Sequence, residues 1–194
     1  MKRYSLLFIA IFCIILNSCK PSSDKAQNYY SDILKQLDLI VEKESVMIQF
    51  INMEMQKTDT NFTSKSKIKI QDTTNLILEI DASYLDFKGQ IDKSLVELEK
   101  VSDFNGKSDL KNAAVDLCKE YKNVVADEYV DVIKIVKIPL SLYTEEDDNK
   151  FLELTETIDN KLQVKIDVYV KILKNFASEY KFELQGDSTK TINK

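Results

Sequence analysis

The chain contains four long segments in which apolar residues recur every three or four positions, the pattern of a helix with one buried face. These segments span about 28–57, 72–101, 108–138 and 144–180. In the first, the apolar stripe consists of Tyr30, Ile33, Leu34, Leu37, Ile40, Val41, Ile48, Ile51 and Met55. The periodicity therefore predicts four amphipathic helices.

Turn and breaker residues separate these segments. The stretch 102–107 contains Asn105-Gly106, a strong turn signal, and Ser108 or Asp109 can cap the helix that follows. Pro139 lacks the amide hydrogen that a helix interior needs, so the third helix should end before it. Thr144 and Asp147 have the spacing of a capping box, which predicts where the fourth helix begins.

These elements predict an all-α fold, an antiparallel up-down four-helix bundle made by a single domain. With only three Gly and two Pro among 194 residues, the chain has little of the turn chemistry that a sandwich or barrel needs. Heptad spacing could also support an intermolecular coiled coil. The Gly-containing turn and the proline break favour a monomeric chain that folds back on itself.

The N-terminus has the features of an export signal. Lys2 and Arg3 precede an apolar run from Leu6 to Leu16, which is too short for a spanning helix of about 20 residues. The segment Leu16-Asn17-Ser18-Cys19 resembles the lipobox of bacterial lipoproteins. The resemblance implies cleavage after residue 18 and acylation of Cys19, with diacylglycerol on the thiol and a further fatty acid such as palmitate. The alternative is an ordinary signal peptide followed by an unrelated cysteine.

Lipidation would divide the chain into a signal peptide (1–18), an acylated cysteine with a polar tether (19–27), the bundle (28–184) and a polar tail (185–194). Several acyl chains hold a protein firmly on a membrane. Lys20 follows the cysteine, and by resemblance to the sorting rule of enteric bacteria this favours the outer membrane. The sequence leaves open whether the protein faces the periplasm or the outside.

The composition argues against most catalytic chemistry. The chain has no His, which removes the commonest general base and the commonest metal ligand. Without Lys2 and Arg3, 25 basic residues remain against 32 acidic ones, an unfavourable balance for binding nucleic acid. The acidic run 145–149 could hold a hard cation, although its place at a helix start already explains it. Cys118 is expected to pack as a small apolar residue. We therefore predict no enzyme activity, cofactor or metal.

One end of the predicted bundle combines several candidate binding residues. In an up-down bundle anchored at its N-terminus, the first and third connections lie together at the end far from the membrane. This membrane-distal tip would bring together Lys65, Lys67, Lys69, Leu140, Leu142 and Tyr143. An apolar patch rimmed by charge is typical of a contact surface. In the alternative interpretation, the lysines simply pair with the acids of 145–148.

Three segments, 28–32, 104–113 and 176–182, resemble a family of leptospiral-type surface lipoproteins without an assigned activity. The resemblance implies no catalytic residues. We therefore expect a lipid-anchored, non-enzymatic interaction module that binds a macromolecular partner through its distal tip. The alternative is a carrier or holdase that takes an apolar ligand or an unfolded chain between its helices.

Overall fold

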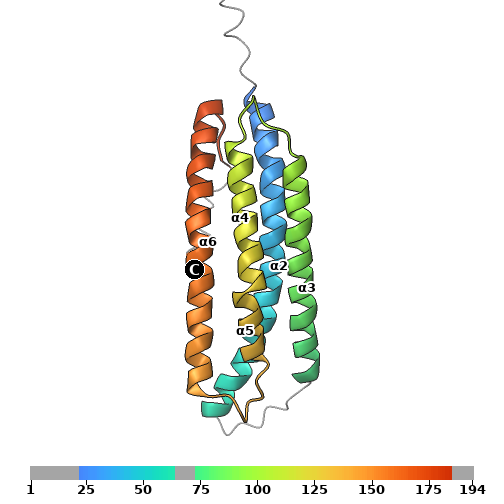
Figure 1. Ribbon diagram of the computed structural model, residues 1–194, viewed down its shortest axis with the longest axis vertical. Coiled ribbons are helices and arrows are strands. Elements are labelled where there is room, and N and C mark those ends of the chain that lie inside the picture. The colour runs from blue at the N-terminus through green and yellow to red at the C-terminus, as the bar shows by residue number, and fades with distance from the viewer. Residues whose placement is uncertain (1–21, 64–72, 185–194) are drawn as a thin grey trace, which may run out of the picture.

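The computed structural model describes residues 22–63 and 73–184, and these residues form helices and short connections without any strand. The helices are α2 (Ser23–Thr63), α3 (Thr73–Lys100), α4 (Asp109–Ala126), α5 (Glu128–Val136) and α6 (Glu145–Tyr180). The prediction of an all-α protein is confirmed. Since α5 continues the path of α4, four long helical segments lie side by side (Figure 1).

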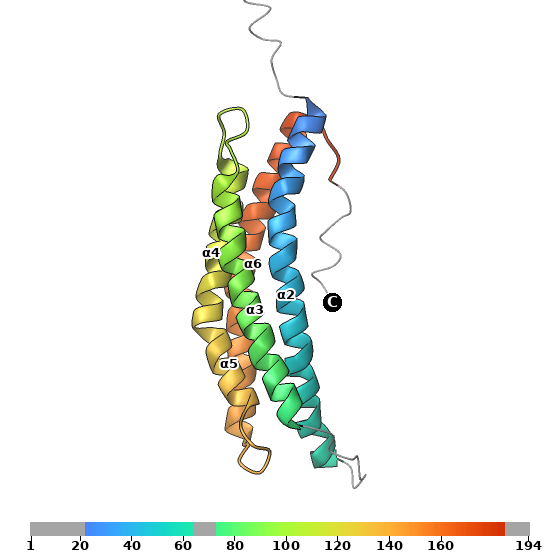
Figure 2. The same ribbon diagram turned by 90° about the vertical axis from the view of Figure 1, so that its right-hand side faces the viewer.

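The helical segments lie along a common long axis (Figures 1 and 2). The start of α2, the α3–α4 connection and the end of α6 share one end, called here the N-terminal end. There, the Ser23 hydroxyl donates to the Lys181 carbonyl over 3.2 Å. The α5–α6 connection lies at the opposite end, called here the far end, where Lys137 pairs with Asp81 near the start of α3.

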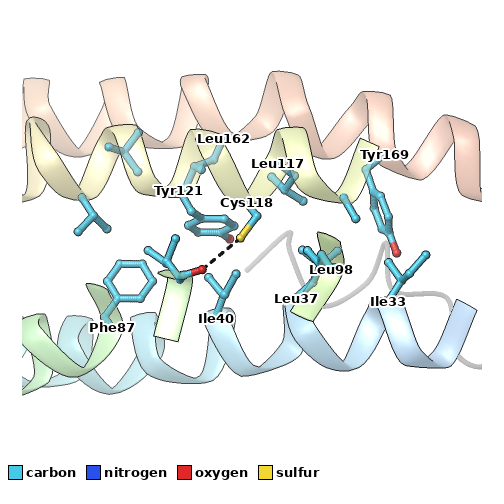
Figure 3. Packing of buried hydrophobic residues seen from close by; sticks show 14 of the residues in the cluster. Ile33, Leu37, Ile40, Phe87, Leu98, Leu117, Cys118, Tyr121, Leu162 and Tyr169 are labelled. Atoms are coloured by element: carbon cyan, nitrogen blue, oxygen red, sulfur yellow. Dashed lines mark hydrogen bonds between the residues drawn. The ribbon is translucent and has the colours of Figure 1, made fainter. Parts of the chain in front are cut away.

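The core is built from the inward stripes of all four segments. Figure 3 shows Ile33, Leu37 and Ile40 of α2 facing side chains of α3, α4 and α6. Many core side chains are fully buried, among them Ile33, Ile40, Met47, Ile80, Phe87, Ile91, Leu98 and Val124. Because burial of each such side chain contributes about 1.5–3 kcal/mol, this continuous apolar layer is the main term that holds the helices together.

Aromatic side chains close the N-terminal end. Asn105 and Gly106 have φ values of 54° and 73°, the left-handed values that a tight Asn-Gly turn requires. The turn holds Phe104 against the rings of Tyr29 and Tyr180, each with a centroid distance of 5.0 Å. The turn predicted from the sequence is therefore present, and its aromatic residue packs onto both α2 and α6.

Three expectations for α2 were wrong. The helix continues to Thr63, beyond the predicted end near residue 57. The helix begins at Ser23, inside the predicted tether, and Ala26 is fully buried, because the first turn packs against the end of α6. Val41 and Ile48, predicted to lie in the buried stripe, are 49% and 36% exposed. The stripe instead follows Ile40, Glu44, Met47 and Ile51, and position 44 was missed because its side chain is charged.

The predicted third helix is interrupted at Asp127, which separates α4 from α5. The Tyr84 hydroxyl on α3 donates to the Val125 carbonyl over 3.1 Å, at the turn where the helical ladder breaks. A side chain that enters the ladder is a common cause of a kink. The predicted stop before Pro139 is confirmed, because α5 ends at Val136. Ser108 takes the N-cap position of α4, but its side chain makes no capping hydrogen bond.

Candidate functional site

The far-end loop, residues 138–143, carries the predicted apolar residues. Pro139 ends helical hydrogen bonding, and its carbonyl accepts from the amides of Leu142 at 2.8 Å and Tyr143 at 3.1 Å. This compact turn leaves the Leu140 and Leu142 side chains 42% and 67% exposed. The structure therefore places two large apolar side chains in solvent at the far end, where burial against a partner would be favourable.

The residues after this loop form an acidic rim. The Thr144 side chain accepts from the Asp147 amide, and the Asp147 carboxylate accepts from the Thr144 amide over 2.9 Å, which confirms the predicted capping box. Hydrogen bonds from the Thr144 side chain and amide lower the pKa of Asp147. Tyr143, half-buried, donates its hydroxyl to Asp148 over 3.3 Å. This tyrosine therefore links the apolar loop to the acidic first turn of α6.

Part of the predicted site lies outside the described residues. This applies to Lys65, Lys67 and Lys69, to Cys19 and the signal peptide, and to the tail 185–194. The structure thus brings Leu140, Leu142 and Tyr143 together in one loop and leaves the lysine half of the predicted tip as a prediction. Asp81 and Asp131 already pair with Lys137 and Lys134 near this end.

A partly buried carboxylate near the middle of the molecule was not predicted. Glu44 of α2 accepts a hydrogen bond from the Tyr129 hydroxyl of α5 over 2.7 Å. Burial raises the pKa of Glu44 to about 7, hydrogen bonds from Tyr129 and Tyr121 act in the opposite direction, and Asp159 of α6 adds to the rise. The signal that could have revealed it is the seven-residue spacing of the α2 stripe, which places Glu44 four residues after Ile40 and seven before Ile51.

The other candidates for chemistry are accounted for by packing. Cys118 is fully buried, and burial, followed by the nearby Asp92 carboxylate, raises the pKa of its thiol to about 12. Such a thiol is a poor nucleophile at neutral pH, in agreement with the predicted packing role. In the part of the chain that the structure describes, no three His, Cys, Asp or Glu side chains are grouped so as to hold a metal ion.

The comparisons with known proteins add no relative to this picture. No family model matches the chain, and neither a curated protein nor a solved structure is similar to it. Among the described helices, none combines the length and apolar character that crossing a membrane requires.

Proposed function

We propose that the protein is a lipid-anchored interaction module whose four helical segments form an antiparallel up-down bundle. In this proposal, Cys19 carries the acyl chains and holds the module on the outer membrane. The far-end loop then binds a macromolecular partner through Leu140 and Leu142. The function is presentation rather than catalysis, and the chain would belong with the surface lipoproteins that its sequence resembles.

The observation that supports this proposal is the placement of the two features at opposite ends. The described chain begins at Ser22, three residues after Cys19, at the N-terminal end. The exposed leucines lie at the far end. At a rise of 1.5 Å per residue, the 36 residues of α6 span about 54 Å between them. A membrane anchor at one end would therefore hold the apolar loop well away from the bilayer.

Site-specific photo-crosslinking in cells tests the proposal. The photoreactive residue p-benzoylphenylalanine is placed at Ser141, between the two leucines, or at Val96, which is 50% exposed in the last turns of α3, toward the N-terminal end of the molecule. We expect an adduct of one defined mass from position 141 and none from position 96. The adduct should disappear when Leu140→Ser and Leu142→Ser are combined with the probe at 141. Equal adducts from both positions, or none from 141, would contradict a partner-binding loop.

The carrier function is the less well supported alternative. Ile33, Ile40, Ile80 and Phe87 are fully buried in a core to which all four segments contribute. An apolar ligand between the helices would have to separate these side chains. The loss of the packing of one large core side chain costs about 2–5 kcal/mol. The carrier hypothesis predicts that residues 20–194 co-purify with lipid, which extraction and mass spectrometry would detect.

A further inference from the structure

One side of the molecule, called here the α2–α6 face, consists of Asp38, Val41 and Ile48 of α2 together with Leu152, Asp159 and Ile166 of α6. The two helices are in contact along this side. Burial is the main cause of the raised pKa of Tyr169 in α6, and the Asp38 carboxylate of α2 adds to it. Burial also raises the pKa of Glu44 in α2, and the Asp159 carboxylate of α6 adds to that rise. Val41 lies one helical turn from both Asp38 and Glu44, so it belongs to the same side of α2.

The α2–α6 face is less tightly packed than the other helix contacts. Along their length, α2 packs against α3 while α6 packs against α4 and α5, and the contact between α2 and α6 is sparser. As a result, Val41 is 49%, Ile48 36% and Leu152 57% exposed, and Ile166 is only half-buried. These side chains are apolar, and no described element covers them.

Ion pairs join several neighbouring helices of the molecule, but the acids of the α2–α6 face take no part in them. An ion pair bridges α2 and α3 (Lys43–Asp86), α3 and α4 (Asp92–Lys122), and α5 and α6 (Glu128–Lys161). A further pair joins Asp81 of α3 to Lys137, the residue that follows α5. Among the residues whose side chains the structure describes, neither Asp38 nor Asp159 forms an ion pair with a lysine. Each edge of this face therefore carries a carboxylate without a cationic partner.

We propose that the α2–α6 face is a docking surface for a basic amphipathic helix of a partner protein. The apolar side of such a helix would cover Val41, Ile48 and Ile166, and its Lys or Arg side chains would pair with Asp38 and Asp159. The occupant is a helix because the face repeats every seven residues on both of its edges. The repeat on α2 consists of Val41 and Ile48, and the repeat on α6 consists of Leu152, Asp159 and Ile166. This is the spacing that receives a further helix in a groove or coiled coil.

The partner's positive charge is argued from complementarity. Carboxylates on both edges would repel an acidic occupant, whereas a cation between them gains two attractions at once. Burial already raises the pKa of Asp38, so this carboxylate is partly desolvated and has more to gain from a cation than a fully hydrated one. This surface is separate from the far-end loop, and the proposal does not depend on that loop binding anything.

The test uses residues 20–194, which include every residue that the structure describes. The probe is a fluorescein-labelled amphipathic helix of Leu and Lys, with a scrambled peptide of the same composition as its control. Anisotropy gives its Kd. Two variants of equal charge are compared: Asp38→Asn with Asp159→Asn, and Glu99→Gln with Asp116→Asn, whose exposed acids lie on α3 and α4. A third variant, Val41→Ser with Ile48→Ser, leaves the charge unchanged.

We expect the Asp38 and Asp159 changes to weaken binding about tenfold, because each lost charge pair is worth roughly 0.7 kcal/mol. The Val41 and Ile48 changes should also weaken it, while the Glu99 and Asp116 changes leave Kd unaltered. Equal weakening by both acid variants would indicate general charge attraction and overturn the proposal. The proposal would also be overturned if the scrambled peptide bound with the same Kd as the helix. It would be overturned, too, if the cationic surfactant dodecyltrimethylammonium bound to the protein and the helical peptide did not. Circular dichroism melting confirms that each variant is folded.

Discussion

At the scale of single residues, Glu44 is the least expected side chain of the core. It occupies the α2 stripe between Ile40 and Met47, both fully buried, where an apolar residue would be the simplest choice. The Tyr129 and Tyr121 hydroxyls compensate part of the desolvation of its carboxylate. The remaining cost makes the stability of the protein depend on pH.

We expect Glu44→Gln to remove this pH dependence. The pKa of Glu44 rises from 4.5 to about 7 on folding, so the folded protein binds the proton more tightly than the unfolded chain. Stability from this group is complete below the unfolded pKa and is lost as pH rises through the folded pKa. Urea denaturation should show wild type losing about 2 kcal/mol relative to Glu44→Gln between about pH 5 and pH 8.

Glu99→Gln, at an exposed position of α3, is the matched control and should follow wild type at both pH values. If the free energy of unfolding of Glu44→Gln changed in parallel with that of wild type, the Glu44 carboxylate would titrate normally. The carboxyl groups that hydrogen bonds hold at a lowered pKa, such as Asp86 and Asp147, affect wild type and variant equally. The difference between the two proteins therefore isolates Glu44.

At the scale of the elements, the ends of the helices are controlled by local chemistry. The Thr144 and Asp147 pair satisfies amides at the start of α6, and Lys181, with a φ of 56°, ends this helix in the left-handed conformation. The α4–α5 break differs in kind. No proline or glycine stands at Asp127, and the interruption coincides with the hydroxyl of Tyr84 reaching across from α3.

Thr144→Ala should lower the free energy of unfolding by about 1 kcal/mol, the usual worth of an N-cap side chain. The control is Thr157→Ala within α6, where the Thr157 hydroxyl only donates back to the Glu153 carbonyl. This change should be neutral or slightly stabilising, because Ala has the higher helix propensity. Urea denaturation of both variants measures the difference, and equal effects would mean that the capping box contributes nothing specific.

At the scale of the whole molecule, the proposed anchor and the exposed loop define a direction from membrane to partner. In this proposal, the acyl chains on Cys19 are the only link to the bilayer. They suffice because each CH₂ buried in the membrane contributes about 0.8 kcal/mol. The described surface at the N-terminal end offers no large exposed apolar side chain beyond Val96 to replace them.

Cys19→Ser should therefore move the protein from the membrane fraction to the soluble fraction of the cell. Cys118→Ser is the matched control: the buried thiol takes no part in anchoring, so this variant should remain with the membrane. Cell fractionation with immunodetection, supported by the mass of the lipidated N-terminal peptide, makes the measurement. Membrane retention of the Cys19 variant would contradict lipid anchoring.

The sequence alone determined the fold class and most element boundaries, because these depend on local chemistry. Apolar spacing predicted the helices, Asn105-Gly106 the turn, Pro139 the end of the third segment, and Thr144 with Asp147 the cap of the fourth. Each of these signals acts through neighbours within a few residues. The exposed leucines of the far-end loop were predicted for the same reason, since a loop leaves apolar side chains nothing to pack against.

Only the tertiary structure decided which faces the helices bury. Whether Val41 or Met47 belongs to the core depends on where α3 and α6 lie around α2, and both are equally apolar in the sequence. The burial of Glu44, the break at Asp127 and the acidic α2–α6 face likewise depend on partners far away in the chain: Tyr129, Tyr84 and Asp159. Helical periodicity records that a face is apolar, whereas burial is set by the side chains that other helices bring to it.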